Sequence, residues 1–592
     1  MAEGWATPDK NDENYHQFIV IGAGIAGLSA ASHLAKNGFK DFKVLEARNR
    51  LGGRVATMQI DGSKVELGAH WIHGILGNPL YELAVSNNLV DVMQSSTPHN
   101  VVATTEEGRR LPFPVLQEIY EAYFWFFKRC EEYFLCKYQP PDGVKTVGEH
   151  VELEINIYLQ RYPPQQRYLR RLIFDYLMKR ESCITGCGTM HEIDLLSIGS
   201  YTELPGGNIA LPTGYSSVLA PILKNIPADN ILKQHPIKTI HWQHVESETG
   251  YDSDGSDSSV NTVKSVGGDD DVGLDTGQIN GISAVSLPAS CRTSRRGSTE
   301  NLYKRKGKPR VKVECENGSI FLADHVICTV PLGLLSSKSL FDPPLPEKRV
   351  SSMSKLVFGV VNKIFLAYDA PFLNPDISEV IVLWNRINEK EVPMAERWYR
   401  KIYSFCKVSD TVLLAWICGE EAKYMENLKM NVVADACTSI LRKFLADPYI
   451  PRPKSCIFTS WGSQPYTGGS YTAIGTGGTQ ADIETIAQPL FSNKKKRVPV
   501  VAFAGEHCHP SFYSTGHGAY LTGRSAAQLC IRSVKEITQQ GEISYNLTDA
   551  SVSDLSSWLQ EVSCGEKNLE DYRAKTSGSR PRRDDGQFVT PR

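Results

Sequence analysis

Three glycines near the start of the chain, Gly22, Gly24 and Gly27, have the G-x-G-x-x-G spacing of a loop that binds a dinucleotide pyrophosphate. Gly22 permits a tight turn, Gly24 lets the backbone approach the phosphates, and Gly27 lets a helix pack closely on a sheet. Glu46 follows 19 positions after Gly27, where a carboxylate accepts hydrogen bonds from the adenosine ribose. These residue types at this spacing predict a dinucleotide cofactor.

A strand, a helix and a second strand must flank these glycines if they are to act together. Residues 18–21 form a short apolar strand, and a helical pattern runs from Ser29 to about Asn37. Residues 42–45 form a second strand that ends at Glu46. The order is that of a βαβ unit, in which the helix N-terminus stabilises phosphate charge through its free N–H groups and positive dipole.

A second glycine-rich segment, residues 48–54, follows the second strand and contains Arg48, Gly53 and Arg54. Arginine side chains suit phosphate oxygens, and glycine permits close approach of the backbone. A domain that binds a nicotinamide cofactor does not need this addition. The segment therefore favours a different dinucleotide.

Two more blocks lie far apart in the chain: residues 65–74 read VELGAHWIHG, and residues 503–519 contain FAGE and YSTGHGA. Together with residues 48–54 they resemble the motifs of the flavin amine oxidase superfamily. The resemblance is strongest to the animal FAD-dependent polyamine oxidases, the spermine and N1-acetylpolyamine oxidases. It extends from about Tyr15 to about Ser533.

This resemblance implies an enzyme that oxidises a secondary amine of spermine or an N1-acetylpolyamine to an imine. Water would split the imine into an amine and an aldehyde, and O2 would reoxidise the flavin and yield hydrogen peroxide. Ser470 occupies the place of the cysteine that links the flavin in monoamine oxidases. The FAD is therefore expected to be bound noncovalently.

The implied fold class is α/β (α+β mixed), with a Rossmann-like FAD-binding domain and a second, discontinuous substrate-binding domain. The expected FAD-binding segments are residues 15–95, 204–245, 309–335 and 458–535, and the expected substrate-binding segments are residues 96–203 and 336–457. Elements read from the pattern include a mainly helical stretch from Pro98 to Tyr201 and one apolar strand at residues 356–366.

Two segments differ from the rest in composition. Residues 246–308 are rich in Ser, Gly and Asp, with acidic and basic residues segregated, which is typical of disorder. Ser298 follows Arg295 and Arg296 and resembles a kinase site, although a solvated charge run is the favoured interpretation. Residues 536–592 are polar and are expected to form a mobile tail.

Lys363 is the first candidate for a catalytic residue, because it interrupts the apolar run at residues 356–366. Burying an ammonium group is costly unless the group has a partner or a function. Periodicity alone leaves a solvent-facing lysine on an edge strand equally open, whereas the resemblance places a lysine here, linked through water to flavin N5. His73 is the second candidate, because histidine titrates near neutral pH; a buried core histidine is the alternative.

The resemblance assigns further contacts to the cofactor and the substrate. Ile237 would meet the adenine through its backbone, and Glu506 would lie near the ribityl–pyrophosphate region. Tyr471 would form one wall of an aromatic slot, and Thr515 stands where monoamine oxidases have the second wall. The expected cofactor contacts thus include Trp71, Ile237, Glu506 and Thr515, and the expected substrate contacts are His73, Tyr471, Thr515 and Ile184.

Ile184 bears on the choice of substrate. Spermine oxidases tend to have an acid at this position, which would pair with the distal ammonium of spermine. Leaving an ammonium unpaired in a partly dry tunnel is unfavourable. Ile184 therefore favours an N1-acetylated polyamine, whose acetylated end is neutral, although Glu192 or Asp194 remain alternative sources of the missing charge.

Composition restricts the partners and the location. The 592 residues carry a net charge of −2, so no overall field favours nucleic acid or an anionic membrane. No apolar run spans a bilayer, the first 14 residues have no signal core, and residues 590–592 are not a peroxisomal S-K-L signal. The 14 cysteines have neither disulfide nor zinc spacing. We expect a cytoplasmic monomer without metal, membrane or nucleic-acid partners, which acts on a polyamine and O2.

Three alternatives remain. A monoamine oxidase would carry the flavin-linking cysteine and a C-terminal membrane anchor. A histone-lysine demethylase would carry an extra N-terminal helical domain and a long helical hairpin. A flavin-bound binding protein without turnover would have no need of Lys363, His73 and Glu506.

Overall fold

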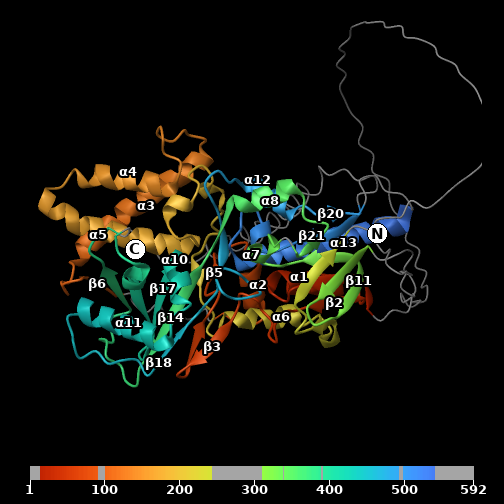
Figure 1. The fold of residues 1–592 in the computed structure, drawn as a ribbon, viewed down its shortest axis with the longest axis horizontal. Coiled ribbons are helices and arrows are strands. Elements are labelled where there is room, and N and C mark those ends of the chain that lie inside the picture. Colours follow the sequence, from red (N-terminus) through yellow and green to blue (C-terminus); the bar gives the residue numbers. More distant parts are fainter. Residues whose placement is uncertain are drawn as a thin grey trace, which may run out of the picture. The chain divides into compact units, whose positions relative to one another are not determined.

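The computed structural model describes residues 14–90, 100–242, 310–337, 339–388, 391–492 and 498–540. The expected disordered insert, with Ser298 inside it, and the expected tail from residue 541 onward lie outside the described residues. Figure 1 traces the chain through its helices and strands.

A nine-stranded sheet contains the dinucleotide motif. Strand β1 (Tyr15–Ile21) pairs in parallel with β2 (Phe42–Leu45) on one side and β11 (Ile320–Cys328) on the other. The strand order is β12-β9-β10-β11-β1-β2-β8, with β21 also beside β11 and β20 beside β21. The other strands are β8 (Ile231–Leu232), β9 (Ile237–His241), β10 (Val311–Cys315), β12 (Phe341–Asp342), β20 (Leu490–Phe491) and β21 (Pro499–Phe503).

Helix α1 (Ile25–Lys36) begins at Ile25 rather than at the predicted Ser29. Every residue from Ile25 to Ser32 is buried, so no polar face marks the first turns in the sequence. Gly27 lies in the first turn, where a Cβ would come within 1.9 Å of the Gly22 carbonyl oxygen. The close packing predicted for Gly27 is therefore present.

A six-stranded sheet forms the second structural layer, in the order β18-β14-β17-β16-β15-β6. Strand β6 (Val101–Thr105) lies within the stretch that was predicted to be mainly helical, so that prediction is wrong at its start. The physical reason is tertiary, because β6 pairs in parallel with β15 from much later in the chain. The other strands are β14 (Val361–Ala367), β15 (Glu379–Leu383), β16 (Ser404–Ser409), β17 (Val412–Cys418) and β18 (Ser455–Phe458).

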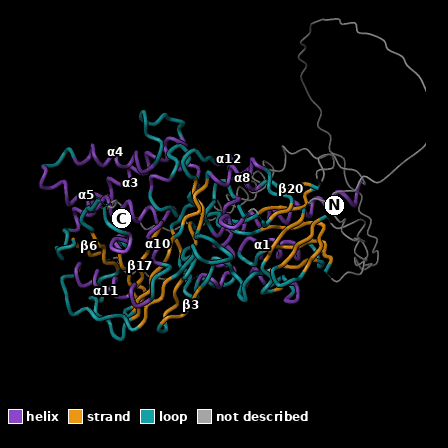
Figure 2. Tube along the Cα trace, viewed as in Figure 1, coloured by secondary structure: helices purple, strands orange, loops and turns teal. Residues whose placement is uncertain are grey.

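Three long helices pack near this second sheet, and Figure 2 shows the strands gathered in two separate groups. Helix α5 contacts both β15 and β17, so its inner face is directed to the six-stranded sheet. The long helices are α3 (Phe113–Leu135), α4 (Val147–Leu159) and α5 (Pro164–Thr185).

The predicted strand at residues 356–366 is two strands in two different sheets. Strand β13 (Leu356–Gly359) pairs with β19 (Tyr471–Ile474), whereas β14 pairs with β17 and β18. The change occurs at Gly359, where a Cβ would come within 1.8 Å of the Gly186 carbonyl oxygen. The end of α5 therefore presses against the backbone there, a contact that local sequence cannot show.

The remaining elements connect these layers. The predicted domain boundaries stay predictions, although β12 at residues 341–342 belongs to the nine-stranded sheet rather than to the second one. No helix of the described ranges is long and apolar enough to cross a membrane. The other elements are β3 (Thr57–Ile60), β4 (Ser63–Glu66), β5 (Ile72–His73), β7 (Asn208–Ile209), α2 (Pro79–Ser86), α6 (Leu219–Leu223), α7 (Leu332–Leu335), α8 (Glu347–Ser354), α9 (Met394–Arg397), α10 (Gly419–Met425), α11 (Met430–Phe444), α12 (Gln480–Ala487) and α13 (Gly516–Gln540).

Replacing residues 246–308 with a short Gly/Ser linker should leave the fold intact, because the strands that flank them are neighbours. Strands β9 and β10 are antiparallel partners, with His241 opposite Lys312, and a loop of a few residues can join such a pair. Shortening a loop changes its closure entropy little, by roughly 0.6 kcal/mol per halving. We expect the melting temperature to shift by less than about 4 °C in calorimetry; insoluble protein would show instead that the segment belongs to a core.

Candidate active site

One cavity of about 1480 Å³ brings together residues from many parts of the chain. Gly27 does not line this cavity, because it lies in the first turn of α1 and faces the Gly22 carbonyl. All the other predicted site residues line it, and these are Gly22, Gly24, Glu46, Arg48, Gly53, Arg54, Trp71, His73, Ile184, Ile237, Lys363, Tyr471, Glu506 and Thr515.

The end of β1 and the start of α1 form the part of the cavity that suits a pyrophosphate. Gly22 has a φ of +95°, and a Cβ there would lie 2.6 Å from Thr329 Oγ1. Gly24 is the N-cap of α1 and supplies no side-chain cap, and it forms a parallel bridge with Gly52 of the second glycine segment. The first N–H groups of α1 are therefore left for a ligand, and negative charge is favoured beside them.

Glu46 is fixed at the end of β2 by backbone N–H groups. The Ala23 N–H donates to Oε2 and the Arg48 N–H donates to Oε1, both at 2.8 Å. The carboxylate keeps further lone pairs for ribose hydroxyls. The Arg48 guanidinium lies over the Tyr466 ring, 5.5 Å from its centroid, and donates to Thr467 Oγ1 at 2.8 Å. Both predicted side chains are thus held at the cavity surface.

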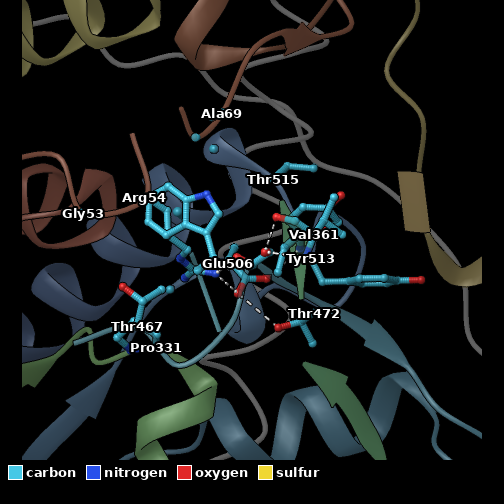
Figure 3. Close-up of a pocket in the computed structure, with 18 of the residues that line it drawn as sticks. Gly53, Arg54, Ala69, Pro331, Val361, Thr467, Thr472, Glu506, Tyr513 and Thr515 are labelled. Carbon is cyan, nitrogen blue, oxygen red and sulfur yellow. Dashed lines mark hydrogen bonds and ion pairs between the residues drawn. The ribbon is translucent and has the colours of Figure 1, made fainter. Parts of the chain in front are cut away.

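Arg54 and Glu506 form a partly buried ion pair, shown with Thr472 in Figure 3. Arg54 Nη1 lies 2.7 Å from Glu506 Oε1 and also donates to the Ser470 carbonyl at 2.8 Å. Glu506 accepts from the Thr472 hydroxyl at 3.1 Å and from the Ser514 N–H at 3.0 Å. Burial would raise the pKa of Glu506, but Arg54 and these hydrogen bonds leave it below the ordinary value. Glu506 therefore stays ionised beside Arg54.

Lys363 lies in the middle of β14, and its side chain is buried, with 8% of the residue exposed. Its Nζ donates to the carbonyl oxygens of Glu66 and Gly68, each at 2.7 Å. Burial lowers the pKa of Lys363 to about 7, and the nearby Glu66 carboxylate offsets part of this effect. The solvent-facing alternative is wrong: this amino group lines the cavity and titrates near neutral pH.

His73 lies in β5, and its Nδ1 is 2.9 Å from Asn208 Oδ1 in the partner strand β7. Because the amide oxygen only accepts, Nδ1 carries the proton and Nε2 is left as an acceptor. Asn208 also lines the cavity. No motif marks this asparagine, since only the pairing of β5 with β7 brings it to His73.

His70 lines the cavity with a buried Nδ1 that has no hydrogen-bond partner among the described residues. Burial, together with the charge of Lys363, lowers the pKa of His70 to about 3. A buried polar atom of this kind is normally satisfied by a ligand or an ordered water. His70 therefore fits a cavity that is filled by a bound molecule.

Three rings, Trp71, Trp416 and Tyr403, form an aromatic wall along the cavity. The Trp71 ring stacks on His70 with 4.0 Å between centroids, and Trp416 stacks on both Trp71 and Tyr403 with 6.4 Å between centroids. Only Trp71 was predicted. Trp416 and Tyr403 come from β17 and the segment before β16, where an aromatic residue is as typical of a core as of a site.

Tyr471 and Thr515 have different roles in the lining. The Tyr471 hydroxyl donates to the Cys183 carbonyl at the end of α5, and a Cβ on Gly186 would lie 2.5 Å from its ring. The Thr515 hydroxyl donates to the Phe512 carbonyl at 2.7 Å and accepts from the Gly518 N–H at 2.9 Å. Thr515 is thus committed to the backbone and leaves the space that a second aromatic wall would fill.

Ile184 lines the cavity, whereas the two acids predicted as alternatives near it do not. Ile184 is 53% exposed. Glu192 and Asp194 do not line the cavity, because they accept the Gly188 N–H at 3.2 Å and the Gly477 N–H at 2.9 Å. Their positions do not support them as sources of the missing charge. Outside the dinucleotide motif and the Arg54–Glu506 pair, the lining carboxylates include Glu131, Glu181, Glu203 and Glu379.

Comparison with known families identifies the chain at this point. The family of flavin-containing amine oxidoreductases matches residues 25–266 and 301–531. The chain belongs to this family and is an FAD-dependent amine oxidase with a mixed α/β fold.

Individual relatives refine the comparison. The peroxisomal N(1)-acetyl-spermine/spermidine oxidase of Homo sapiens is 30% identical over 529 residues, covering 85% of this chain and 93% of that protein. A possible lysine-specific histone demethylase 1 of Drosophila melanogaster is 26% identical, covering 85% of this chain and 62% of that protein. A solved putrescine oxidase double mutant is similar in fold, with a TM-score of 0.58, 18% identity, and coverage of 88% of this chain and 99% of its own.

The described residues fit FAD. The uncapped start of α1, Glu46, Arg48 and the Arg54–Glu506 pair would hold its pyrophosphate and ribose parts. When bound, FAD accepts the hydride that is removed from the carbon beside the amine nitrogen. The described ranges contain no group of His, Cys, Asp or Glu placed to hold a metal ion, and the described cysteines are free thiols.

Acid precipitation should release the FAD, because position 470 carries no thiol. The Ser470 hydroxyl donates to the Val361 carbonyl at 3.0 Å and accepts the Val361 N–H at 2.9 Å, so it is committed to β14. We expect yellow flavin in the supernatant, measured by its visible absorbance. Flavin that stays with the pellet after washing would contradict noncovalent binding.

The substitution Lys363→Met should change how stability depends on pH. The folded-state pKa of about 7 lies below the ordinary value of 10.5, so folding releases a proton between these values. The Lys363 contribution to stability therefore rises with pH across this window, by at most about 1.4 kcal/mol per pH unit, and is lost as the pH falls towards 7.

The measurement is the melting temperature of wild type minus that of Lys363→Met, with FAD bound, at several pH values above 7. We expect the difference to increase with pH. Lys355→Met is the matched control, because Lys355 pairs with Asp482 at 3.1 Å and is 43% exposed in its side chain. A difference that stays constant for Lys363→Met would show that the amino group remains charged when buried.

Proposed function

We propose that this chain oxidises a secondary amine inside a polyamine to an imine, which water splits into an amine and an aldehyde, while O2 is reduced to hydrogen peroxide. The observation that carries the proposal is the set of carboxylates at Glu131, Glu203 and Glu379 in one cavity. A chain with several ammonium groups needs several anionic partners in a desolvated tunnel, whereas a monoamine does not. The names of the human and bovine relatives support the same class of substrate.

Different residues of the cavity have different roles in this reaction. The reacting amine must be neutral, because a cation does not support the developing iminium. His73 can take its proton at Nε2, since Nδ1 donates to Asn208. The aromatic wall and Tyr471 exclude water and guide the methylene chain. Lys363, with a pKa of about 7, can exchange a proton with water in the cavity during oxygen reduction or imine hydrolysis.

Among polyamines, we propose that N1-acetylated forms are preferred over free spermine. Ile184 supports this preference, because its exposed side chain offers no charge to a terminal ammonium. Glu181 is the carboxylate nearest to it in sequence. Burial raises the pKa of Glu181 to about 7, so it is a weak partner for a cation at neutral pH.

The alternatives have less support. A monoamine oxidase would link its flavin to a cysteine, and Ser470 stands there. The demethylase relative contains far more chain than this protein matches, since only 62% of it is covered. A binding protein without turnover would not explain a buried lysine with a near-neutral pKa in the same cavity as His73 and Glu506. Anaerobic bleaching of the flavin band by a polyamine separates an enzyme from a binding protein.

The cellular context is also a proposal. We propose that the protein acts in the cytoplasm as a monomer, because its composition and its net charge of −2 are those of an ordinary globular protein. Two relatives carry the word peroxisomal in their names, so imaging of the full chain fused at its N-terminus is the direct test.

Peroxide release across spermine, spermidine and their N1-acetyl forms tests the function. We expect kcat/KM for N1-acetylspermine to exceed that for spermine at least roughly tenfold, because an unpaired buried polar group costs about 1–3 kcal/mol or more. A preference for free spermine would overturn the choice of polyamine and leave the reaction intact. No peroxide and no bleaching with any of the four amines would overturn the proposed function itself.

A further inference from the structure

Arg180 is an unexpected residue in the wall of a cavity that we assign to a polyamine. It lies in α5, one helical turn before Ile184, and both residues line the cavity. Positions i and i+4 share one face of a helix and lie about 6 Å apart along its axis. A fixed cation in such a wall repels an ammonium group, so its presence requires a reason.

The surroundings of Arg180 are polar and aromatic. Tyr403 lines the same part of the cavity, and so do Glu379 and Cys406, which are directly paired across β15 and β16. The hydroxyls of Tyr120 and Tyr176 lie 2.6 Å from each other and add to the field that Arg180 experiences. Arg180 is therefore placed where α5 meets the six-stranded sheet.

The donors of Arg180 have no acceptor in the protein. No hydrogen bond or ion pair reaches its guanidinium within the part of the chain that the structure describes. Glu181 is next to it in sequence, but adjacent residues of a helix do not face each other. A guanidinium has five N–H groups in a fixed planar arrangement, and they are left for a ligand that brings an acceptor.

The charge of Arg180 is retained. Burial lowers its pKa, but Tyr176, Tyr120 and Glu181 raise it above the ordinary value. A free primary ammonium placed here meets a like charge, which disfavours binding. The carbonyl oxygen of an amide is neutral, accepts two hydrogen bonds and gains from a charged donor.

We propose that Arg180 is the residue that selects an acylated chain end, by donating hydrogen bonds to the amide carbonyl oxygen of the substrate. Its charge at the same time excludes a free terminal ammonium from this part of the cavity. The inference rests on the proposed function, and it adds a positive determinant to the apolar one at Ile184.

Two contacts hold this part of α5 in place independently of Arg180. The Cys183 carbonyl accepts the Tyr471 hydroxyl, and Lys179 Nζ donates to the Arg400 carbonyl at 2.8 Å. Arg180 therefore lies at a fixed position relative to the substrate slot at Tyr471. A substitution at 180 that keeps the apolar stem should leave the helix where it is.

The test compares Arg180→Met, Arg180→Lys and the control Arg167→Met, which removes a cation of the same helix that does not line the cavity. Steady-state kcat/KM is measured for N1-acetylspermine and spermine, and FAD content is measured by absorbance. For Arg180→Met we expect kcat/KM with N1-acetylspermine to fall roughly tenfold to a hundredfold, while that with spermine is unchanged or rises. Arg180→Lys should lose activity with the acetylated substrate and keep the exclusion of spermine.

Several outcomes would overturn the inference. An equal fall with both substrates in Arg180→Met would mean a structural role, and a fall with spermine alone would mean that the local carboxylates dominate. Arg167→Met should leave the ratio of the two kcat/KM values unchanged, and a similar change there would mean a general electrostatic effect. Wild-type protein that is inactive with every polyamine would contradict the proposed function. If wild-type protein is active and Arg180→Met leaves the ratio of the two kcat/KM values unchanged, only this inference is contradicted.

Discussion

The buried amino group of Lys363 is the interaction on which the site depends. Strand β14 belongs to the six-stranded sheet, whereas the carbonyls of Glu66 and Gly68 belong to the segment that carries Trp71 and His73. An amino group in an apolar strand must find acceptors, and these are the ones that it finds. These hydrogen bonds therefore fix the distance between the six-stranded sheet and the segment that carries Trp71 and His73. The Trp461 indole N–H, which donates to the Leu67 carbonyl at 3.0 Å, adds a second connection to the same segment.

Charge is distributed along the cavity in a way that suits two ligands of opposite sign. Arg48 and the start of α1 lie where an anionic pyrophosphate would bind. Carboxylates such as Glu131 and Glu203 line the same cavity and would favour a cationic chain. The Arg54–Glu506 pair neutralises itself, so it orients groups without favouring either ligand. The anionic pyrophosphate and the cationic chain would thus each be attracted by charges of opposite sign in the same cavity.

The sequence predicted the cofactor end of the site better than the substrate end. Gly22, Gly24 and Glu46 act through backbone contacts of one βαβ unit, so their spacing contains the geometry. Asn208, Trp416 and Arg180 reach the site only through the pairing of β5 with β7, the six-stranded sheet and the position of α5. No local pattern encodes such contacts.

The same distinction explains the errors in the fold. The strands around Gly359 read as one apolar run, and the backbone of Gly186 in a distant helix end divides them. Helix α1 was predicted to begin late because its first turns are buried on all sides and show no amphipathic period. Lys363 could be singled out because a lysine in an apolar strand is out of keeping with its neighbours, and this is visible without a structure; the structure buries it and places it in the cavity lining.

A cavity shared by cofactor and substrate has a consequence for the order in which the protein is assembled. The glycine loops, the carboxylates and the aromatic wall line one continuous space, so FAD bound at the glycine loops would itself form part of the surroundings of a bound amine. Affinity for the amine is then a property of the loaded protein and not of the chain alone. Newly made chains in a cell short of flavin would neither retain polyamine nor be stabilised by it, and the supply of the vitamin rather than of the amine would decide how much folded protein accumulates.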